Sequence, residues 1–194
     1  MSNKHHHFGG RTLARAQALQ LLFQAEATDR TVYEVLEGDY ALSQGPLDPF
    51  GEMLARGADD MRHELDAVIS ATSSNWSVSR MPSVDRNLLR LALYEMLEVD
   101  EVAIAVTIDE SVELAKAFGS DESPKFINGV LGRVASKMDK GVDVVAEAKR
   151  LEAERAAHED AEDAEDDECE GAGVEARDEA AEAVGADDEG LGEE

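Results

Sequence analysis

Two prolines in this sequence directly follow residues that commonly begin helices, and this limits the fold more than any other feature. Asp48 precedes Pro49, and Ser123 precedes Pro124. Proline is favoured at the first position of a helix, and Asp or Ser before it can cap the free N–H groups there. We therefore expect a helix to follow each pair, the first running unbroken through Ile69.

Apolar residues recur at helical spacing through most of the chain's first 140 residues. Thr107 and Glu110 form the capping box at the start of one further helix, and Gly119 is expected to end that helix. Ser83 is the expected N-cap of another helix. The strand candidate Val102 to Val106 is short, and no segment shows a sustained period of two. We therefore predict an all-α fold of about seven helices, with elements over 12–27, 31–38, 49–69, 72–82, 83–97, 107–118 and 123–138.

Acidic residues are concentrated in the last part of the chain. The formal net charge is -26, and residues 141–194 hold 22 acidic residues against 4 basic ones. Beyond residue 158 there is no aromatic residue and only isolated Val and Leu, too little apolar surface to offset the entropy of ordering. The expected organisation is a flexible arm (1–10), a helical domain (11–140), a helix-prone linker (141–158) and a disordered acidic tail (159–194).

Cysteine content and hydropathy exclude several classes of protein. Cys169 is the only cysteine, so a disulfide framework is excluded and a cytoplasmic location is expected. The sequence has no run of 18 apolar residues and no apolar signal segment, so no membrane contact is expected. His5 to His7 are either natural or a tag remnant.

No motif for catalysis is present: a phosphate-binding loop, CxxC, HExxH and GxSxG are all missing. His63 is the one histidine inside the helical domain, and we expect it on the surface. Asp59 and Asp60 are neighbours, which point about 100° apart on a helix and do not form an acid/base pair. The sequence predicts no enzyme, no cofactor and no metal site.

The helix expected over 12–27 holds no acid before Glu26. Arg11, Arg15, Leu19 and Phe23 form one i,i+4 row that is cationic where the helix begins and apolar further on. We expect both arginines to project from the end of the domain. They are either ordinary solvated residues or a small arm that contacts phosphates, too weak to bind RNA alone.

Three segments, "DRNLLRLALYEM", "ESVELAKAFGS" and "SPKFINGVL", resemble the NusB family of bacterial transcription antitermination factors. The resemblance covers Arg11 to Met138 and implies two packed three-helix subdomains with a seventh element. It implies a non-catalytic protein that joins the ribosomal protein NusE and binds the single-stranded boxA element of nascent RNA in ribosomal RNA operons. RNA polymerase and other Nus factors are the further partners implied.

The resemblance also implies site residues. Single-stranded RNA is recognised by aromatic and Arg planes that stack on bases and by cations on phosphates. Phe126 has an alternative place in the core, and Asp85 is expected to face the basic ribosomal protein. The residues expected to face RNA are Arg11, Arg15, Phe23, Glu122, Ser123, Lys125 and Phe126.

The sequence departs from the family pattern in its arm, where Thr12 and Leu13 occupy positions that are often basic. A second hypothesis is therefore a NusB-like module that works only through protein contacts, including as a homodimer. A third is an RNA cytosine methyltransferase, which can carry a NusB-like domain, but this chain lacks the length and cofactor loop. The acidic tail either competes with RNA for the arm or only aids solubility.

Overall fold

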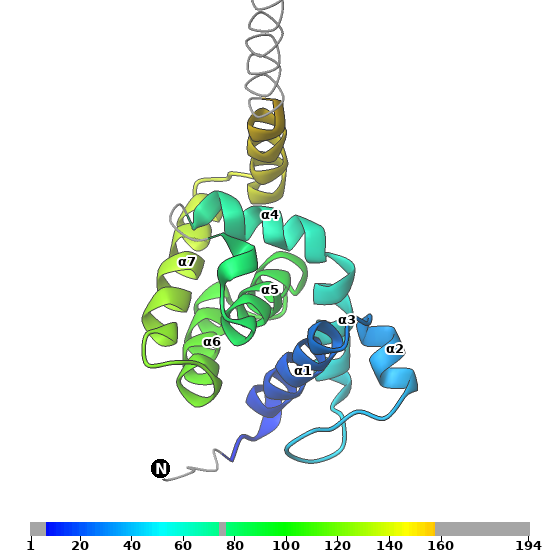
Figure 1. Ribbon diagram of the computed structural model, residues 1–194. Helices are drawn as coiled ribbons and strands as arrows, with labels where there is room; N and C mark the ends of the chain where they lie inside the picture. The colour runs from blue at the N-terminus through cyan, green and yellow to red at the C-terminus, as the bar shows by residue number, and fades with distance from the viewer. Residues whose placement is uncertain (1–6, 74–76, 158–194) are drawn as a thin grey trace, which may run out of the picture. The chain divides into compact units, whose positions relative to one another are not determined.

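The structure, a computed structural model, describes residues 7–73 and 77–157 (Figure 1). The chain divides into one unit of Met1–Leu151 and a second of Glu152–Glu194. Of the second unit only residues 152–157 are described, and they are helical. The expectations for the tail, Cys169, His5 and His6 therefore lie outside the described residues.

All regular structure in the described ranges is helical, which confirms the predicted fold class. None of the described helices is long and apolar enough to cross a bilayer. The elements are α1 (Gly10–Ala27), α2 (Val32–Glu37), α3 (Pro49–Asp60), α4 (Arg62–Thr72), the 3₁₀ turn η1 (Val78–Arg80), α5 (Ser83–Glu98), α6 (Ile104–Phe118) and α7 (Ser123–Met138), followed by a helix over 144–157.

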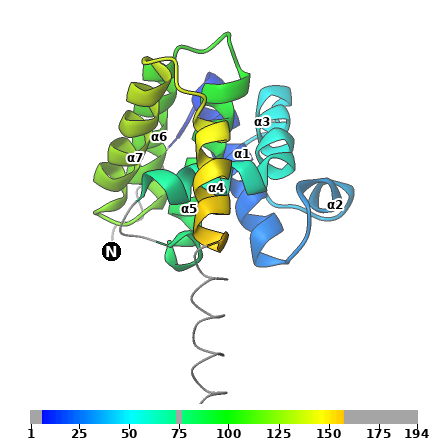
Figure 2. The ribbon, with the colours of Figure 1, turned by 90° about the horizontal axis from the view of Figure 1, so that it is seen from above.

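Helix α5 lies at the centre of the first unit. It packs against α1, α3, α4, α6 and α7, while α1 also packs on α3 and α6 on α7 (Figures 1 and 2). Leu88, Leu89, Leu91 and Leu93 on α5 are all buried. Four leucines within six residues point to different sides of a helix, so the central position of α5 explains its apolar sequence.

The long helix expected after Asp48 is in fact two helices, α3 and α4. The chain turns at Met61, where φ is -94° and ψ is 15°, and the Met61 N–H still donates to Gly57 O. The apolar pattern continues across the break, with Leu54 and Leu65 both buried. The turn allows α3 to pack against α1 while α4 packs against α5 and α7, so tertiary packing outweighs local helix propensity here.

Two expected N-caps are also wrong. Helix α6 begins at Ile104, with Ala103 as its N-cap, so Thr107 lies inside the helix and forms no capping box. The N–H groups of Val106 and Thr107 both donate to the Ala103 carbonyl, which converts most of the strand candidate into the first helical turn. Pro82 is the N-cap of α5, and no side chain caps it.

An ion-pair network joins three helices near the middle of the first unit. Glu26 on α1 accepts from Arg86 Nη2 at 2.6 Å and Arg90 Nη1 at 2.8 Å, and Arg90 also donates to Asp66 on α4 at 2.7 Å. Burial by itself raises the pKa of Glu26, but hydrogen bonds from Arg86 and Ser83 and the charges of Arg86 and Arg90 lower it to about 2. The Glu26 carboxylate is therefore held in its charged form.

Candidate nucleic-acid interface

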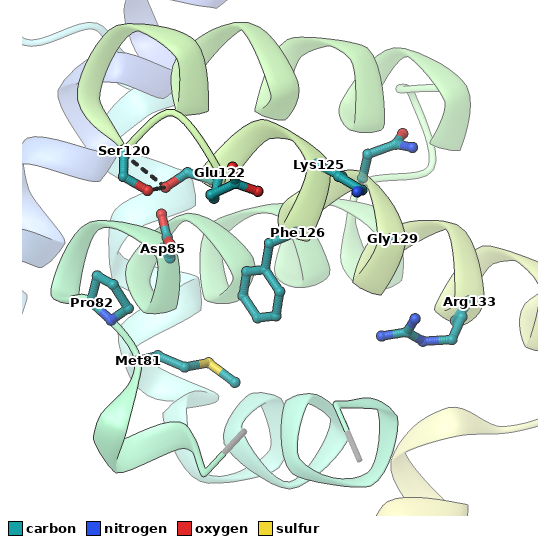
Figure 3. A pocket seen from close by; sticks show the side chains of 11 residues that line it. Met81, Pro82, Asp85, Ser120, Glu122, Lys125, Phe126, Gly129 and Arg133 are labelled. Atoms are coloured by element: carbon teal, nitrogen blue, oxygen red, sulfur yellow. Dashed lines mark hydrogen bonds between the residues drawn. The ribbon is translucent and has the colours of Figure 1, made fainter. Parts of the chain in front are cut away.

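A groove of about 680 Å³ lies between α7 and the chain that leads from η1 into α5 (Figure 3). It contains four of the residues expected to face RNA, together with Asp85. The structure therefore brings the α6–α7 connection and the start of α5 to one place. The groove is lined by Met81, Pro82, Asp85, Ser120, Glu122, Ser123, Lys125, Phe126, Asn128, Gly129 and Arg133.

A tight connection between α6 and α7 holds one edge of this groove. Gly119 ends α6 as predicted, and a Cβ at this position would stand 2.6 Å from the Ser123 side chain. The Ser123 hydroxyl accepts from the Ser120 N–H at 2.9 Å and is buried. The Ser123 hydroxyl therefore stabilises this turn. The N-cap of α7 is Glu122, not Ser123 as expected.

The N-cap and the first turn of α7 carry the remaining three expected residues of the groove. Glu122 and Lys125 are exposed, while Phe126 is half-buried and lines the groove, between the core and surface positions that the sequence left open. An aromatic ring beside a lysine is a combination suited to a stacked base and its phosphate.

Asp85 lies at the opposite wall, in the first turn of α5. It is only 5% exposed, and its Oδ1 atom has no hydrogen-bond partner among the described residues. A buried carboxylate oxygen without a donor is costly, because hydration is lost and nothing replaces it. Asp85 is thus a recessed acceptor, whereas the sequence placed it on an exposed protein-facing surface.

Arg15 does not project from the domain as expected. Its side chain is 4% exposed, and its Nε donates to both oxygens of Glu95, at 3.1 and 2.9 Å. Arg15 Nη1 also lies 3.4 Å from Glu110. Carboxylates on α5 and α6 draw the guanidinium into the interior, since a buried arginine needs such partners.

Arg11 does reach the surface, with 54% of its side chain exposed. Its Nη2 lies 3.6 Å from Glu101, and its guanidinium stands 4.9 Å from the centre of the Phe50 ring. The ion pair with Glu101 is easily exchanged for one with another anion, because exposed ion pairs contribute little free energy.

Phe23 occupies a second, smaller hollow of about 340 Å³, away from the groove of Figure 3. It is 43% exposed, and Phe118 lines the same hollow. Val84 also lines it, and Val84 directly precedes Asp85. The two hollows therefore lie on either side of the first turn of α5.

Three glutamines on α1 hold the segment 41–48 that borders the second hollow. Gln17 donates to the carbonyls of Gln44 and Pro46 and accepts from the Asp48 N–H. Gln24 exchanges two hydrogen bonds with the backbone of Ala41, each of 2.9 Å. Gln20 also forms two hydrogen bonds with Ser43: its side-chain oxygen accepts from the Ser43 N–H, and its side-chain nitrogen donates to the Ser43 hydroxyl.

Six groove residues were not among those expected from the sequence: Met81, Pro82, Ser120, Asn128, Gly129 and Arg133. The signal for Arg133 was available, because Lys125, Gly129 and Arg133 are spaced by four and share one face of α7. Helix α7 also contains no acidic residue, in a chain of net charge -26. Apart from its chain neighbours and the local backbone of α7, the only described atom within 4 Å of a Cβ at Gly129 is Arg133 Nη1, at 3.9 Å, so a side chain here would touch no other helix.

His63 is exposed, as predicted. In the described part of the chain no group of three His, Cys, Asp or Glu residues is placed to hold a metal ion. Asp59 and Asp60 form hydrogen bonds with α2. Asp59 accepts from the Val32 N–H at 2.7 Å, and Asp60 accepts from the Tyr33 hydroxyl at 2.9 Å.

Residues 12–136 match the family described as the NusB family. A protein of Bacillus subtilis called transcription antitermination protein NusB is 42% identical over 130 residues, which cover 67% of this chain and 98% of that protein. The structure of T. maritima NusB is 35% identical, with a TM-score of 0.58 over 68% of this chain and 94% of that one. A crystal structure of the antitermination factors NusB and NusE in complex with double-stranded RNA shares the fold, at 24% identity and a TM-score of 0.53, over 64% of this chain and 94% of that one.

Proposed function

Because this chain belongs to the NusB family, we propose that it is a non-catalytic transcription antitermination factor that binds RNA together with NusE. The observation that carries the proposal is the match over residues 12–136, which include every helix from α2 to α6 and nearly all of α1 and α7. The match takes in seven of the eight residues expected in the site, and Arg11 directly precedes it.

We further propose that the RNA is the single-stranded boxA element of ribosomal RNA operons. The assembly then acts in the cytoplasm on RNA polymerase, with other Nus factors. These finer assignments follow the resemblance of "SPKFINGVL" and its neighbours to the family.

The groove on α7 supplies the chemistry that single-stranded RNA needs. Phe126 offers a ring for stacking, Lys125 a cation for a phosphate, and Glu122 an acceptor for a base amino group. Phe23 offers a second ring on the other side of the α5 turn. These are few contacts, which is why a protein partner is part of the proposal.

The two arginines of α1 take different parts in this proposal. Arg11 binds a phosphate directly, after its exposed pair with Glu101 opens. Arg15 acts as a positioning residue, because its guanidinium is buried between Glu95 and Glu110 and keeps α1 in place beneath Arg11.

A salt series of RNA binding tests the proposal, with the full chain measured alone and with NusE. We expect NusE to raise the affinity for a boxA RNA. Arg11→Ala and Lys125→Ala should each weaken binding and flatten the dependence of log K on log salt by about 0.7, the value for one lost contact on a single strand. Arg56→Ala is the matched control, since Arg56 pairs with Glu52 on α3, outside the groove.

The burial of Arg15 favours a second candidate function, a module that works only through protein contacts, as a homodimer or on NusE. With Arg15 inside, the cationic arm on α1 is reduced to Arg11. NusE binding without any gain in RNA affinity would support this module and contradict the RNA-binding factor.

A further inference from the structure

An exposed face of α3 carries aromatic, sulfur and charged side chains that the fold does not bury. Four of its residues follow one another at helical spacing, so they lie on the same side of α3. Helices α2 and α5 each add one tyrosine, through contacts with these four. We call the six residues the tyrosine face: Met53, Arg56, Gly57 and Asp60 of α3, Tyr33 of α2 and Tyr94 of α5.

The tyrosine face is separate from the groove and from the hollow that contains Phe23. None of its six residues lines either of them. Tyr94 lies nine residues after Asp85 on α5, which is about 14 Å along the helix axis. Figures 1 and 2 show α2 and α3 on the side of the first unit opposite α7. A ligand on this face therefore need not compete with one in the groove.

Tyr33 and Arg56 are held in place although they remain accessible. The Arg56 guanidinium stands 4.4 Å from the centre of the Tyr33 ring, and its Nη2 lies 2.8 Å from Glu52. The Tyr33 hydroxyl donates to Asp60 at 2.9 Å. Even so, Tyr33 is 40% exposed and the Arg56 side chain 34%. Side chains that are already ordered lose less entropy when a partner binds.

Tyr94 lies directly against α3 because residue 57 has no side chain. A Cβ at Gly57 would overlap the Tyr94 ring. The Tyr94 hydroxyl contacts Met53 Sδ at 3.9 Å, and Met53 is 38% exposed. Glycine is unfavourable inside a helix, and here it allows Tyr94 and Met53 to form one continuous surface.

The charge around the tyrosine face is negative. Residues 29–60 hold 8 acidic residues against 2 basic ones, and one of the two, Arg56, is paired with Glu52. Asp60 and Glu98 are exposed and form no ion pair with any described residue. Burial raises the pKa of the Tyr94 hydroxyl, and the charges of Glu98 and Asp60 raise it further. Both carboxylates therefore act at Tyr94.

We propose that the tyrosine face binds a basic segment of a protein partner, in which lysine or arginine side chains stand beside apolar ones. A cation of the partner lies against the Tyr94 ring, where ring and carboxylates both attract it. An apolar side chain of the partner packs on Met53 and Tyr33. Tyrosine, methionine and arginine are the side chains enriched where proteins bind one another, and few of them supply most of the binding energy.

Charge disfavours the two other occupants of this face. RNA would bring phosphates toward Asp60 and Glu98, while the one cation of the face, Arg56, is already paired. A second copy of the chain would place the same acidic surface opposite itself, because a two-fold interface joins identical patches. A basic protein segment is the occupant that both carboxylates attract.

Methionine signals can locate the binding of a basic probe. Met53 is the methionine of the tyrosine face, and Met81 is the methionine that lines the groove. The probe is a short synthetic peptide in which arginine and leucine alternate, added to the full chain with ¹³C-labelled methionine methyl groups. Met53→Leu and Met81→Leu assign the two signals. We expect the peptide to shift the Met53 signal and to leave the Met81 signal in place.

Fluorescence anisotropy of the labelled peptide at about 0.15 M salt, where the screening length is about 8 Å, measures affinity. Tyr33→Ala should raise Kd about fivefold, as the loss of apolar contact and of the support for Arg56 requires. Tyr40→Ala is the matched control, since Tyr40 is 39% exposed and lies outside the face. Both variants keep the acidic tail, so attraction of the peptide to the tail cancels between them.

A second pair of variants tests the role of charge. Asp60→Asn with Glu98→Gln should raise Kd about threefold and flatten its salt dependence, within the range for exposed charge pairs. Asp109→Asn with Glu113→Gln removes the same charge from exposed positions of α6 and should leave Kd unchanged. A peptide with glutamine in place of arginine should not bind. Thermal unfolding confirms that each variant is folded.

Several results would overturn the proposal. They are a peptide that does not shift the Met53 signal, equal Kd for Tyr33→Ala and Tyr40→Ala, and equal binding of the glutamine peptide. Displacement of the peptide from Met53 by boxA RNA would assign the face to RNA. A dimer in analytical ultracentrifugation that Tyr33→Ala makes monomeric would assign it to a second copy. Failure of the chain to bind RNA with NusE contradicts only the proposed function.

Discussion

Single residues decide how much of the cationic surface is available to a ligand. Arg11 and Arg15 stand one helical turn apart, yet one is half exposed and the other is enclosed by Glu95 and Glu110. The same residue type therefore serves binding at one position and packing at the next.

Arg15→Ala should destabilise the fold by about 3–5 kcal/mol, because it leaves the buried Glu95 carboxylate without its partner. Urea unfolding at neutral pH measures this change. Arg11→Ala is the control and should alter the free energy of unfolding by less than about 0.5 kcal/mol, as exposed substitutions usually do. Equal effects of the two variants would contradict the assigned roles.

Glu26 gives the fold a dependence on acid pH. Its pKa is lowered from 4.5 to about 2 in the folded state, so its contribution to stability is present above pH 4.5 and is lost as pH falls toward 2. Glu26→Gln should therefore flatten the loss of stability across this window. Urea unfolding at several pH values checks it, with Glu37→Gln, an exposed residue of α2, as the control expected to behave as wild type.

At the scale of elements, glycines mark where two helices approach closely and where they do not. A Cβ at Gly51 on α3 would stand 2.5 Å from the Ala14 carbonyl oxygen on α1, whereas a Cβ at Gly132 on α7 would have no described atom within 4 Å apart from its chain neighbours and the local backbone of α7.

Gly51→Ala should cost about 1–3 kcal/mol, since the backbone of α1 must move away from α3. Gly132→Ala, the same change at an open helical position, should stabilise the fold by up to about 1 kcal/mol through higher helix propensity. Thermal unfolding of the two variants gives opposite shifts in Tm if this is right, and shifts of the same sign if it is not.

Much of the element pattern could be predicted from the sequence, because helix periodicity and the Gly119 stop are local signals. The break at Met61 could not, since the apolar pattern runs through it and only the separate packing of α3 and α4 requires it. The Thr107 capping box was misleading for a related reason: the Ala103 carbonyl begins α6 one turn earlier.

The candidate site was predictable in part. The resemblance of "SPKFINGVL" pointed to Lys125 and Phe126, which do share a groove. The burial of Arg15 was not predictable from α1 alone, because its partners lie 80 and 95 residues away in the chain. Asp85 was identified, but its recessed position depends on how α7 lies across the start of α5.

At the scale of the whole molecule, charge is the dominant property. Residues 159–194 hold 18 acidic residues and one arginine, attached to a domain whose proposed ligand is also an anion. Long-range repulsion of this kind acts mainly on association rates and is screened by salt.

Removal of residues 159–194 should raise the association rate of RNA at low ionic strength, and the gain should disappear near about 1 M salt, where the screening length is about 3 Å. Stopped-flow fluorescence measures the association rate of RNA with the full-length chain and with the truncated chain. A chain of full length with the tail acids changed to Gln and Asn should behave like the truncated one if charge is the cause. Unchanged affinity and salt slope would assign the tail to solubility alone.

The glutamine row on α1 has a consequence for engineering. Gln17 and Gln24 bind the segment 41–48 through main-chain atoms, so these hydrogen bonds do not depend on the side chain at position 41. Ala41 is exposed and borders the hollow that contains Phe23. A dye attached to a cysteine at position 41 should thus report occupancy of that hollow while the helix keeps its hold on the backbone, with Cys169 as the one competing thiol to remove.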